Sequence, residues 1–190
     1  MSYSEFFKIY NGNILTQSKC GTRFLDKVFG TCEEIISLNS LLEDEYKNRF
    51  NIVIIRDPRE HLLSAISTTY DTYGTIENQL SVISKGYDPH WNPNLFKYLY
   101  IYGLKNKITI LHLKDITNYI ENVLKLGKHI NGMSYQTVNK TDKKFMENLL
   151  KNHEDVWKYM NNLLEIEYSF YNKLINENEI YQPKKELKLI

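Results

Sequence analysis

A short polar segment, residues 16–23, contains the residue types best suited to binding an anion. Lys19 supplies a full positive charge, and Ser18 and Thr22 supply hydroxyl donors. Gly21 lets the main chain approach a phosphate closely, and a helix beginning here would direct backbone N–H groups and the positive end of its dipole at the ligand. The segment therefore predicts an anion-binding loop. A helix N-cap followed by a surface lysine is the structural alternative.

This loop differs from the phosphate-binding loop of nucleoside triphosphate enzymes. That loop has the pattern G-x-x-x-x-G-K-[ST], in which the lysine directly follows the second glycine. Residues 16–23 lack the first glycine, and Lys19 comes before Gly21. ATP is therefore not the favoured ligand.

A second polar segment directly follows a run of β-branched residues, 51–55. Arg56 can fork onto a phosphate, and Ser64 lies two turns further along a helix that Pro58 opens. Open α/β sheets bind their ligands at the carboxyl ends of strands, so the segment predicts a second anion contact. The alternative is that Arg56 forms a structural ion pair with Asp57 and that Ser64 is a helix-surface hydroxyl.

Alternating strand and helix patterns would position both segments. Strands are predicted over residues 13–17, 34–38, 51–55 and 107–113. Helices are predicted over residues 22–29, from Pro58 onward, from 92 to about 102 and over 115–126. This alternation indicates an α/β fold. After residue 141, helical spacing of apolar residues predicts a helical C-terminal third, with Tyr168 and Tyr171 as packing residues.

Length and composition set further limits. The 190 residues fit one domain, 1–190, and no repeat or linker divides them. The formal charge of +1 gives no global basic field for nucleic acid, so any anion site must be local. Two cysteines are too few for a disulfide framework or a thiolate zinc site, and no metal is expected. No apolar run approaches a membrane span, so we expect no membrane partner and a soluble, cytoplasmic protein.

Together the two segments resemble the sulfotransferase superfamily, whose members use 3′-phosphoadenosine-5′-phosphosulfate (PAPS) as sulfuryl donor. The family's first motif, P-K-S/T-G-T-T-x-L, aligns with residues 18–25, with Ser18 at the proline and Cys20 at the small residue. The second motif pairs an arginine after a strand with a serine eight positions later, the spacing of Arg56 and Ser64. The resemblance implies a P-loop-like, three-layer α/β/α domain with a central, mostly parallel sheet.

The resemblance also implies which residues bind the donor. In the family the first motif holds the 5′ phosphosulfate and the second holds the 3′-phosphate. Residues 139–141 look like an Asn-Lys-Thr element that lies near the donor in some members. The implied donor-binding residues are Ser18, Lys19, Cys20, Gly21, Thr22, Arg23, Arg56, Ser64, Asn139 and Lys140.

Two further stretches are similar to the carbohydrate-modifying branch of this superfamily. Residues 88–93 match its D-x-H-W-x-P segment, and residues 108–127 look like the strand and helix that follow. The implied reaction is in-line transfer of a sulfuryl group to a hydroxyl of a carbohydrate or another small acceptor, with adenosine 3′,5′-bisphosphate leaving. The family's chemistry requires no metal and no thiol intermediate, so Cys20 is a loop residue.

Such a transfer assigns roles to a cation and a base. Lys19 would neutralise charge on the departing phosphate. His90 is the first choice of base because imidazole titrates near neutral pH, and Trp91 would offer a flat surface to a sugar. Glu34 is the second choice, since some members place their base before the second motif. Three further residues stay open as bases: Glu33, Glu43 and His61.

Two other function classes remain open. A P-loop-like nucleotide kinase would hold a phosphoryl donor with the same lysine and would need magnesium. No strand ends in a clear Walker-B acid, because Arg56 precedes Asp57 after residues 51–55. A catalytically inactive nucleotide-binding module would bind the donor without turnover.

Overall fold

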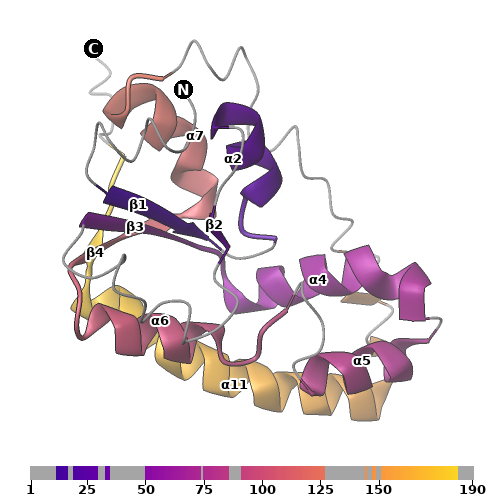
Figure 1. The fold of residues 1–190 in the computed structure, drawn as a ribbon. Helices are drawn as coiled ribbons and strands as arrows, with labels where there is room; N and C mark the ends of the chain where they lie inside the picture. The colour runs from indigo at the N-terminus through magenta and orange to yellow at the C-terminus, as the bar shows by residue number, and fades with distance from the viewer. Residues whose placement is uncertain are drawn as a thin grey trace, which may run out of the picture.

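A parallel sheet is the centre of the structure, a computed structural model of the chain (Figure 1). The structure describes residues 12–16, 19–29, 33–34, 50–73, 75–85, 91–126, 144, 147–148 and 151–183. The five strands run in the order β2-β1-β3-β4-β5, and every neighbouring pair is parallel. They are β1 (Gly12–Thr16), β2 (Glu33–Glu34), β3 (Phe50–Ile55), β4 (Ile108–His112) and β5 (Glu179–Ile180).

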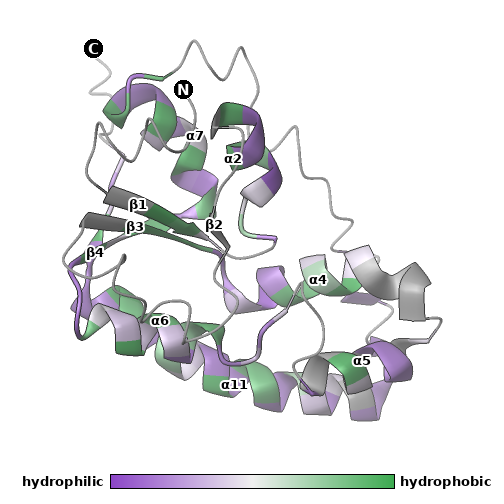
Figure 2. Ribbon diagram, viewed as in Figure 1, coloured by the Kyte–Doolittle hydropathy of each residue, from purple (hydrophilic) through white to green (hydrophobic). Residues whose placement is uncertain are grey.

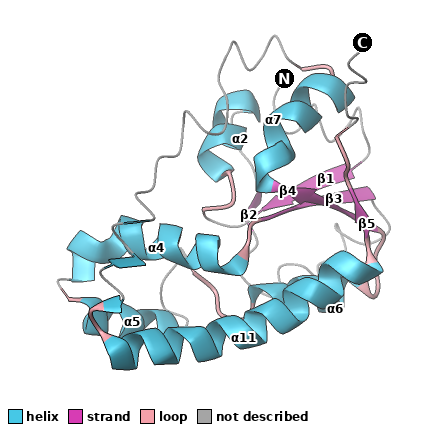
Figure 3. Ribbon diagram, turned by 180° about the vertical axis from the view of Figure 1, so that it is seen from behind, coloured by secondary structure: helices cyan, strands magenta, loops and turns pink. Residues whose placement is uncertain are grey.

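Helices cover both faces of this sheet (Figures 1 and 3). The α2 and α7 helices lie on one face, α6 and α11 lie on the other, and α4 and α5 extend past the edge. The helical elements are α2 (Thr22–Phe29), α4 (Pro58–Tyr73), α5 (Ile76–Ser84), α6 (Leu95–Gly103), the 3₁₀ turn η2 (Leu113–Asp115), α7 (Ile116–Asn118), the π-helix η3 (Tyr119–Val123) and α11 (Glu154–Glu177). The α/β class predicted from the sequence is confirmed.

The central strands are buried on both faces, as their unbroken apolar runs require. Alternate residues of β3 enter different clusters: Ile52 and Ile54 pack with α2 and α7, whereas Val53 and Ile55 pack with α6 and α11. Figure 2 shows this hydrophobic character in the strands, while the helices carry hydrophilic residues on their outer sides. Packing against the hydrophobic clusters on both faces determines where each strand ends along the sheet.

Most predicted elements are confirmed with ends shifted by at most three residues. Of the strand predicted over residues 34–38, only Glu34 lies within the described residues, where it belongs to β2. The predicted helix over residues 115–126 is wrong as a continuous α-helix, because the chain passes through η2, α7 and η3 in turn. The π-type bond from the Leu124 N–H to the Tyr119 carbonyl, 3.1 Å, widens the last turn. The α5 helix and the short β5 strand were not predicted.

The β5 strand forms through contacts between distant parts of the chain. The Tyr181 N–H donates to the Ile110 carbonyl at 2.8 Å, and the Tyr181 hydroxyl lies 2.6 Å from the Asn118 side-chain oxygen. The ring of Tyr181 also packs edge-on against that of Tyr119. These contacts explain why two residues after a long helix pair with a strand.

In the part of the chain that the structure describes, no helix is both long enough and apolar enough to cross a bilayer.

Candidate functional site

The lysine loop, defined here as residues 19–21, connects β1 to α2 at the carboxyl edge of the sheet. Lys19 adopts a left-handed backbone conformation with φ of 66°, and Gly21 has φ of 97°. The Thr16 hydroxyl donates to the Cys20 carbonyl at 2.8 Å, and the Phe24 and Leu25 N–H groups donate to the Gly21 carbonyl at 3.0 Å. The loop is therefore held in a tight turn at the start of α2.

Gly21 is required at its position for two reasons. Its positive φ is strained for any residue with a side chain. A Cβ there would also lie 2.8 Å from Cδ1 of Leu113 and 3.4 Å from Cδ1 of Ile116. The space next to Gly21 is thus filled by the segment after β4, against which the lysine loop packs.

Arg56 joins the lysine loop to the end of β3. Its side chain is 6% exposed, and Nη1 donates to the Lys19 carbonyl at 3.1 Å. Its Nε lies 3.6 Å from Oε2 of Glu60, one turn further along the chain. The alternative of an Arg56–Asp57 ion pair is therefore wrong, because Arg56 pairs with Glu60 and the lysine loop.

Asp57 instead holds the start of α4. The Glu60 N–H donates to Oδ1 of Asp57 at 3.1 Å, so Asp57 caps the helix that Pro58 opens. The Tyr168 hydroxyl lies 2.9 Å from each Asp57 carboxylate oxygen and donates to that group. Burial and the Asp57 carboxylate raise the pKa of Tyr168 to about 12. This contact connects α11 to the site.

A cavity of about 250 Å³ opens between the carboxyl ends of β3 and β4. Its lining residues are Ile55, Arg56, Asp57, Glu60, His112, Leu113, Lys114 and Tyr171. The two strands end at the same level because Ile55 pairs with His112 in the sheet. Arg56 and Lys114 are the cations of this wall, and Asp57 and Glu60 are its carboxylates, so an anionic group would bind here through the two cations while Arg56 also faces Glu60.

Burial changes the titration of two rings at this cavity. Desolvation lowers the pKa of His112, the nearby Lys114 adds to this effect, and Asp115 opposes it. Desolvation raises the pKa of Tyr171, and the charges of Asp57 and Glu60 raise it further. At neutral pH both rings are uncharged, and His112 can accept a hydrogen bond through one ring nitrogen.

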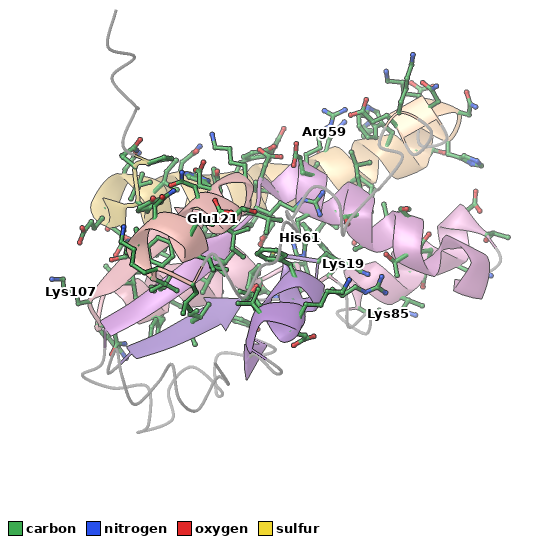
Figure 4. The ribbon with its side chains drawn as sticks, turned by 90° about the horizontal axis from the view of Figure 1, so that it is seen from above. Lys19, Arg59, His61, Lys85, Lys107 and Glu121 are labelled. Carbon is green, nitrogen blue, oxygen red and sulfur yellow. The ribbon has the colours of Figure 1, made fainter. Side chains whose placement is uncertain are left out.

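The structure brings only some of the predicted site residues together. Lys19, Cys20, Gly21 and Arg56 meet at the junction of β1 and β3. Figure 4 shows Lys19 at the carboxyl edge of the sheet, with Lys107 at the opposite end. Five predicted residues lie outside the described ones: Ser18, Glu43, His90, Asn139 and Lys140.

The other predicted residues lie around this junction. Thr22 and Arg23 begin α2, and Arg23 is exposed. Ser64 lies on α4 and is 6% exposed, so it is not a surface hydroxyl. Glu34 pairs with Thr16 across the sheet, which places its backbone level with the end of β1. Cys20 is 1% exposed, in agreement with its interpretation as a loop residue.

Trp91 and His61 are core residues. Both are fully buried, and their ring centroids lie 5.1 Å apart. Trp91 belongs to a cluster with Leu62, Met160 and Leu164. The expectation that Trp91 offers a surface to a sugar is therefore wrong, because the packing of α4 against α11 encloses its ring. The same packing removes His61 from contact with an acceptor.

Four residues that line the cavity were not predicted from the sequence to belong to the site: Asp57, His112, Lys114 and Tyr171. His112 and Lys114 follow a β-branched run, so the strand-end argument that selected Arg56 would also have selected them. Tyr168 and Tyr171 were expected only to pack. The helical spacing of aromatic residues does not show that their helix passes the ends of β3 and β4.

The fold and the site define an α/β protein with lysine and arginine side chains at the carboxyl edge of a parallel sheet. Within the described residues, no three His, Cys, Asp or Glu side chains gather as they would around a metal ion. Comparisons of the chain with family models, with curated proteins and with solved structures found no match.

Proposed function

We propose that this protein is a PAPS-dependent sulfotransferase that acts on a hydroxyl of a carbohydrate or another small acceptor. One observation carries the proposal: Arg56 donates to the Lys19 carbonyl and so joins the two segments whose spacing matches the family motifs. The two segments are far apart in the chain, and they meet at the carboxyl ends of the neighbouring parallel strands β1 and β3. This edge is where α/β sheets of many enzymes bind anionic ligands.

The residues present fit a donor with two anionic ends. Lys19 lies in a loop at the start of α2, where the helix dipole favours negative charge. Arg56 and Lys114 line the neighbouring cavity, which can receive a second phosphate. We assign Lys19 and the start of α2 to the 5′ phosphosulfate, and Arg56 with Lys114 to the 3′-phosphate.

PAPS, when bound, supplies the sulfuryl group that is transferred. Lys19 stabilises the negative charge that develops on the phosphate side of the breaking bond. The backbone of the lysine loop is fixed by Thr16 and Arg56, so Lys19 does not need to reorganise its main chain during the reaction. Cys20 stays buried, which fits direct transfer.

The acceptor hydroxyl needs a base, and the proposal retains His90 and Glu34 for this role. The pairing of Glu34 with Thr16 supports Glu34, because it lies on the strand next to the lysine loop. Glu34→Gln and His90→Ala, compared for turnover and for donor affinity, distinguish the two. The base variant loses turnover and keeps donor affinity.

The test is thermal unfolding with adenosine 3′,5′-bisphosphate, with Mg-ATP and 5′-AMP as controls. A ligand at about 100 times its dissociation constant adds roughly 2.7 kcal/mol, which raises the unfolding midpoint of a domain of this size by about 5 to 11 °C. A shift with the bisphosphate alone supports the proposal. A shift with Mg-ATP alone supports the kinase, and binding of the bisphosphate without transfer supports the inactive module. No shift with the bisphosphate contradicts the proposed donor site.

A further inference from the structure

Four apolar side chains form a second stripe along α11. They are spaced four, three and four residues apart: Tyr159, Leu163, Ile166 and Phe170. Tyr159 is 40% exposed and Ile166 is 55% exposed, and both stand among the most exposed large hydrophobic residues in the described part of the chain. Leu163 and Phe170 are half-buried. Tyr159 and Ile166 are therefore open to solvent, whereas Leu163 and Phe170 are only partly so.

This stripe adjoins the face that holds α11 to the domain, and the two meet at Phe170, which packs against the buried cluster of α6 and lies 6.1 Å from the ring of Tyr100. Met160, Leu164, Glu167 and Leu174 form the buried face. With 3.6 residues per turn, the stripe lies about a quarter-turn away from that face around the helix axis. Figures 1 and 3 show α11 along the outer edge of the molecule in two opposite views. A helix with two apolar faces has more apolar surface than its own domain covers.

We propose that the stripe is the contact between two copies of the chain, paired through antiparallel α11 helices. The spacing of the four residues is that of a coiled-coil seam, in which such side chains pack into a facing helix. In an antiparallel pair centred near Leu164, Tyr159 faces Phe170 of the second copy, and Leu163 faces Ile166. A twofold axis makes each of these contacts occur twice.

Two charged residues next to the stripe favour pairing with a second copy in the antiparallel direction. Asp155 and Lys173 are both exposed and lie at equal sequence distance from Leu164, on opposite sides. Five turns separate them, so they occupy the same position around the helix. An antiparallel pair brings each Asp155 to Lys173 of the other copy, whereas a parallel pair would bring like charges together. The helix dipoles also favour the antiparallel direction.

Contacts within one chain hold Lys173 beside the stripe. Its Nζ lies 5.4 Å from the ring centroid of Phe170 and 5.8 Å from that of Tyr100. The ammonium group is thus positioned at one end of the seam before pairing. The seam between Asp155 and Lys173 is about 27 Å long, and one helix pair of this length gives a small interface. We therefore expect a weak dimer, with a dissociation constant on the order of micromolar.

The first experiment measures the mass of the full chain by sedimentation velocity as its concentration rises. The unmodified chain changes from monomer to dimer, and Ile166→Asp raises the dissociation constant at least tenfold, because a charge enters the seam. Asn172→Asp is the control, since it adds the same charge on the other side of α11. A chain that stays monomeric at the highest concentration, or an Ile166→Asp variant that pairs as before, overturns the proposal.

A second experiment tests direction with surface charges that leave the apolar seam intact. Asp155→Lys alone and Lys173→Asp alone each place like charges opposite one another and weaken pairing at least tenfold. An equal mixture of the two variants restores opposite charges at both ends and forms the dimer again. Single variants that pair like the unmodified chain, or a mixture that does not pair, overturn the antiparallel arrangement.

Discussion

At the carboxyl edge of the sheet, the structure on the β1 side of β3 differs from the structure on its β4 side. On the side of β1, the lysine loop is closed by hydrogen bonds from Thr16 and Arg56. On the side of β4, the strands leave a cavity lined by Arg56, His112, Lys114 and Tyr171. One side presents a fixed turn with a single cation, and the other presents a hollow with several polar groups.

Arg56 belongs to both sides and therefore connects them. The same guanidinium group donates to the Lys19 carbonyl and lines the cavity. A ligand that draws Arg56 toward the cavity would also change how the lysine loop is held. The two sides are therefore expected to act as one binding site with two differently built halves.

The largest expected effect comes from removing the charge of Lys19, in the lysine loop on the β1 side. Lys19→Ala should lower turnover by about 10² to 10³, the usual cost of losing one group that stabilises transition-state charge. The unfolding midpoint should stay within a few degrees, because the side chain is only half-buried. Steady-state kinetics measure this, and Lys85→Ala is a matched control at an exposed lysine.

Lys19→Gly provides a second variant for the same question. Glycine accepts the φ of 66° without strain, so this variant removes the charge while easing the backbone. Turnover close to that of the unmodified chain in either variant would show that Lys19 has no electrostatic role.

The next largest effect concerns α11, whose Tyr171 lines the cavity on the β4 side. Burial of Glu167 raises its pKa to about 8, and the Phe96 backbone moderates the rise. A raised pKa means that the folded protein keeps a proton that the unfolded chain has released. Stability is therefore greatest below the ordinary pKa of 4.5 and is lost as pH rises toward 8.

Denaturant unfolding at several pH values measures this loss. Between pH 5.5 and 7.5 the free energy of unfolding should fall steadily, by up to about 3 kcal/mol, because one group keeps its proton in the folded protein alone. Glu167→Gln should flatten the profile, whereas Glu165→Gln, at an exposed position of the same helix, should not. An unchanged slope in Glu167→Gln would refute the assignment.

A smaller effect is expected where α11 touches the capping carboxylate of α4. Tyr168→Phe removes the hydroxyl that donates to Asp57 and should cost about 1.5 to 2 kcal/mol, the usual value for a hydrogen bond to a charged group. Urea unfolding gives this difference directly. Tyr159→Phe, on the exposed stripe of the same helix, is the control and should be nearly neutral. Equal effects in the two variants would contradict the role of the Asp57 contact.

The smallest expected effect tests whether the cavity on the β4 side binds the 3′-phosphate. Lys114→Ala should weaken binding of adenosine 3′,5′-bisphosphate by up to about fivefold, because an exposed ion pair contributes at most about 1 kcal/mol. Binding of 5′-AMP, which lacks this phosphate, should not change. Calorimetric titration measures both, with Lys107→Ala at the opposite end of the sheet as control (Figure 4). Equal losses for the two nucleotides would place the 3′-phosphate elsewhere.

Local sequence patterns predicted much of the fold. The β-branched run before Arg56 gave the central strand, and Pro58 gave the start of α4, because both signals depend on neighbouring residues alone. The β5 strand escaped prediction because its two residues pair with β4 only through long-range contacts such as that of Tyr181. Trp91 was misinterpreted for a related reason, since adjacent residues do not reveal a ring enclosed by two distant helices.

The sequence by itself determined the α/β class and the two segments, because strand runs, glycine and helix starts are local properties. Only the tertiary structure decided what these segments contact. It paired Arg56 with Lys19 and Glu60 instead of Asp57, and it placed His112 and Tyr171 around one cavity. Such contacts depend on where strands end relative to one another and on how α11 crosses them. The packing of the two cores sets both, and no short stretch of sequence encodes it.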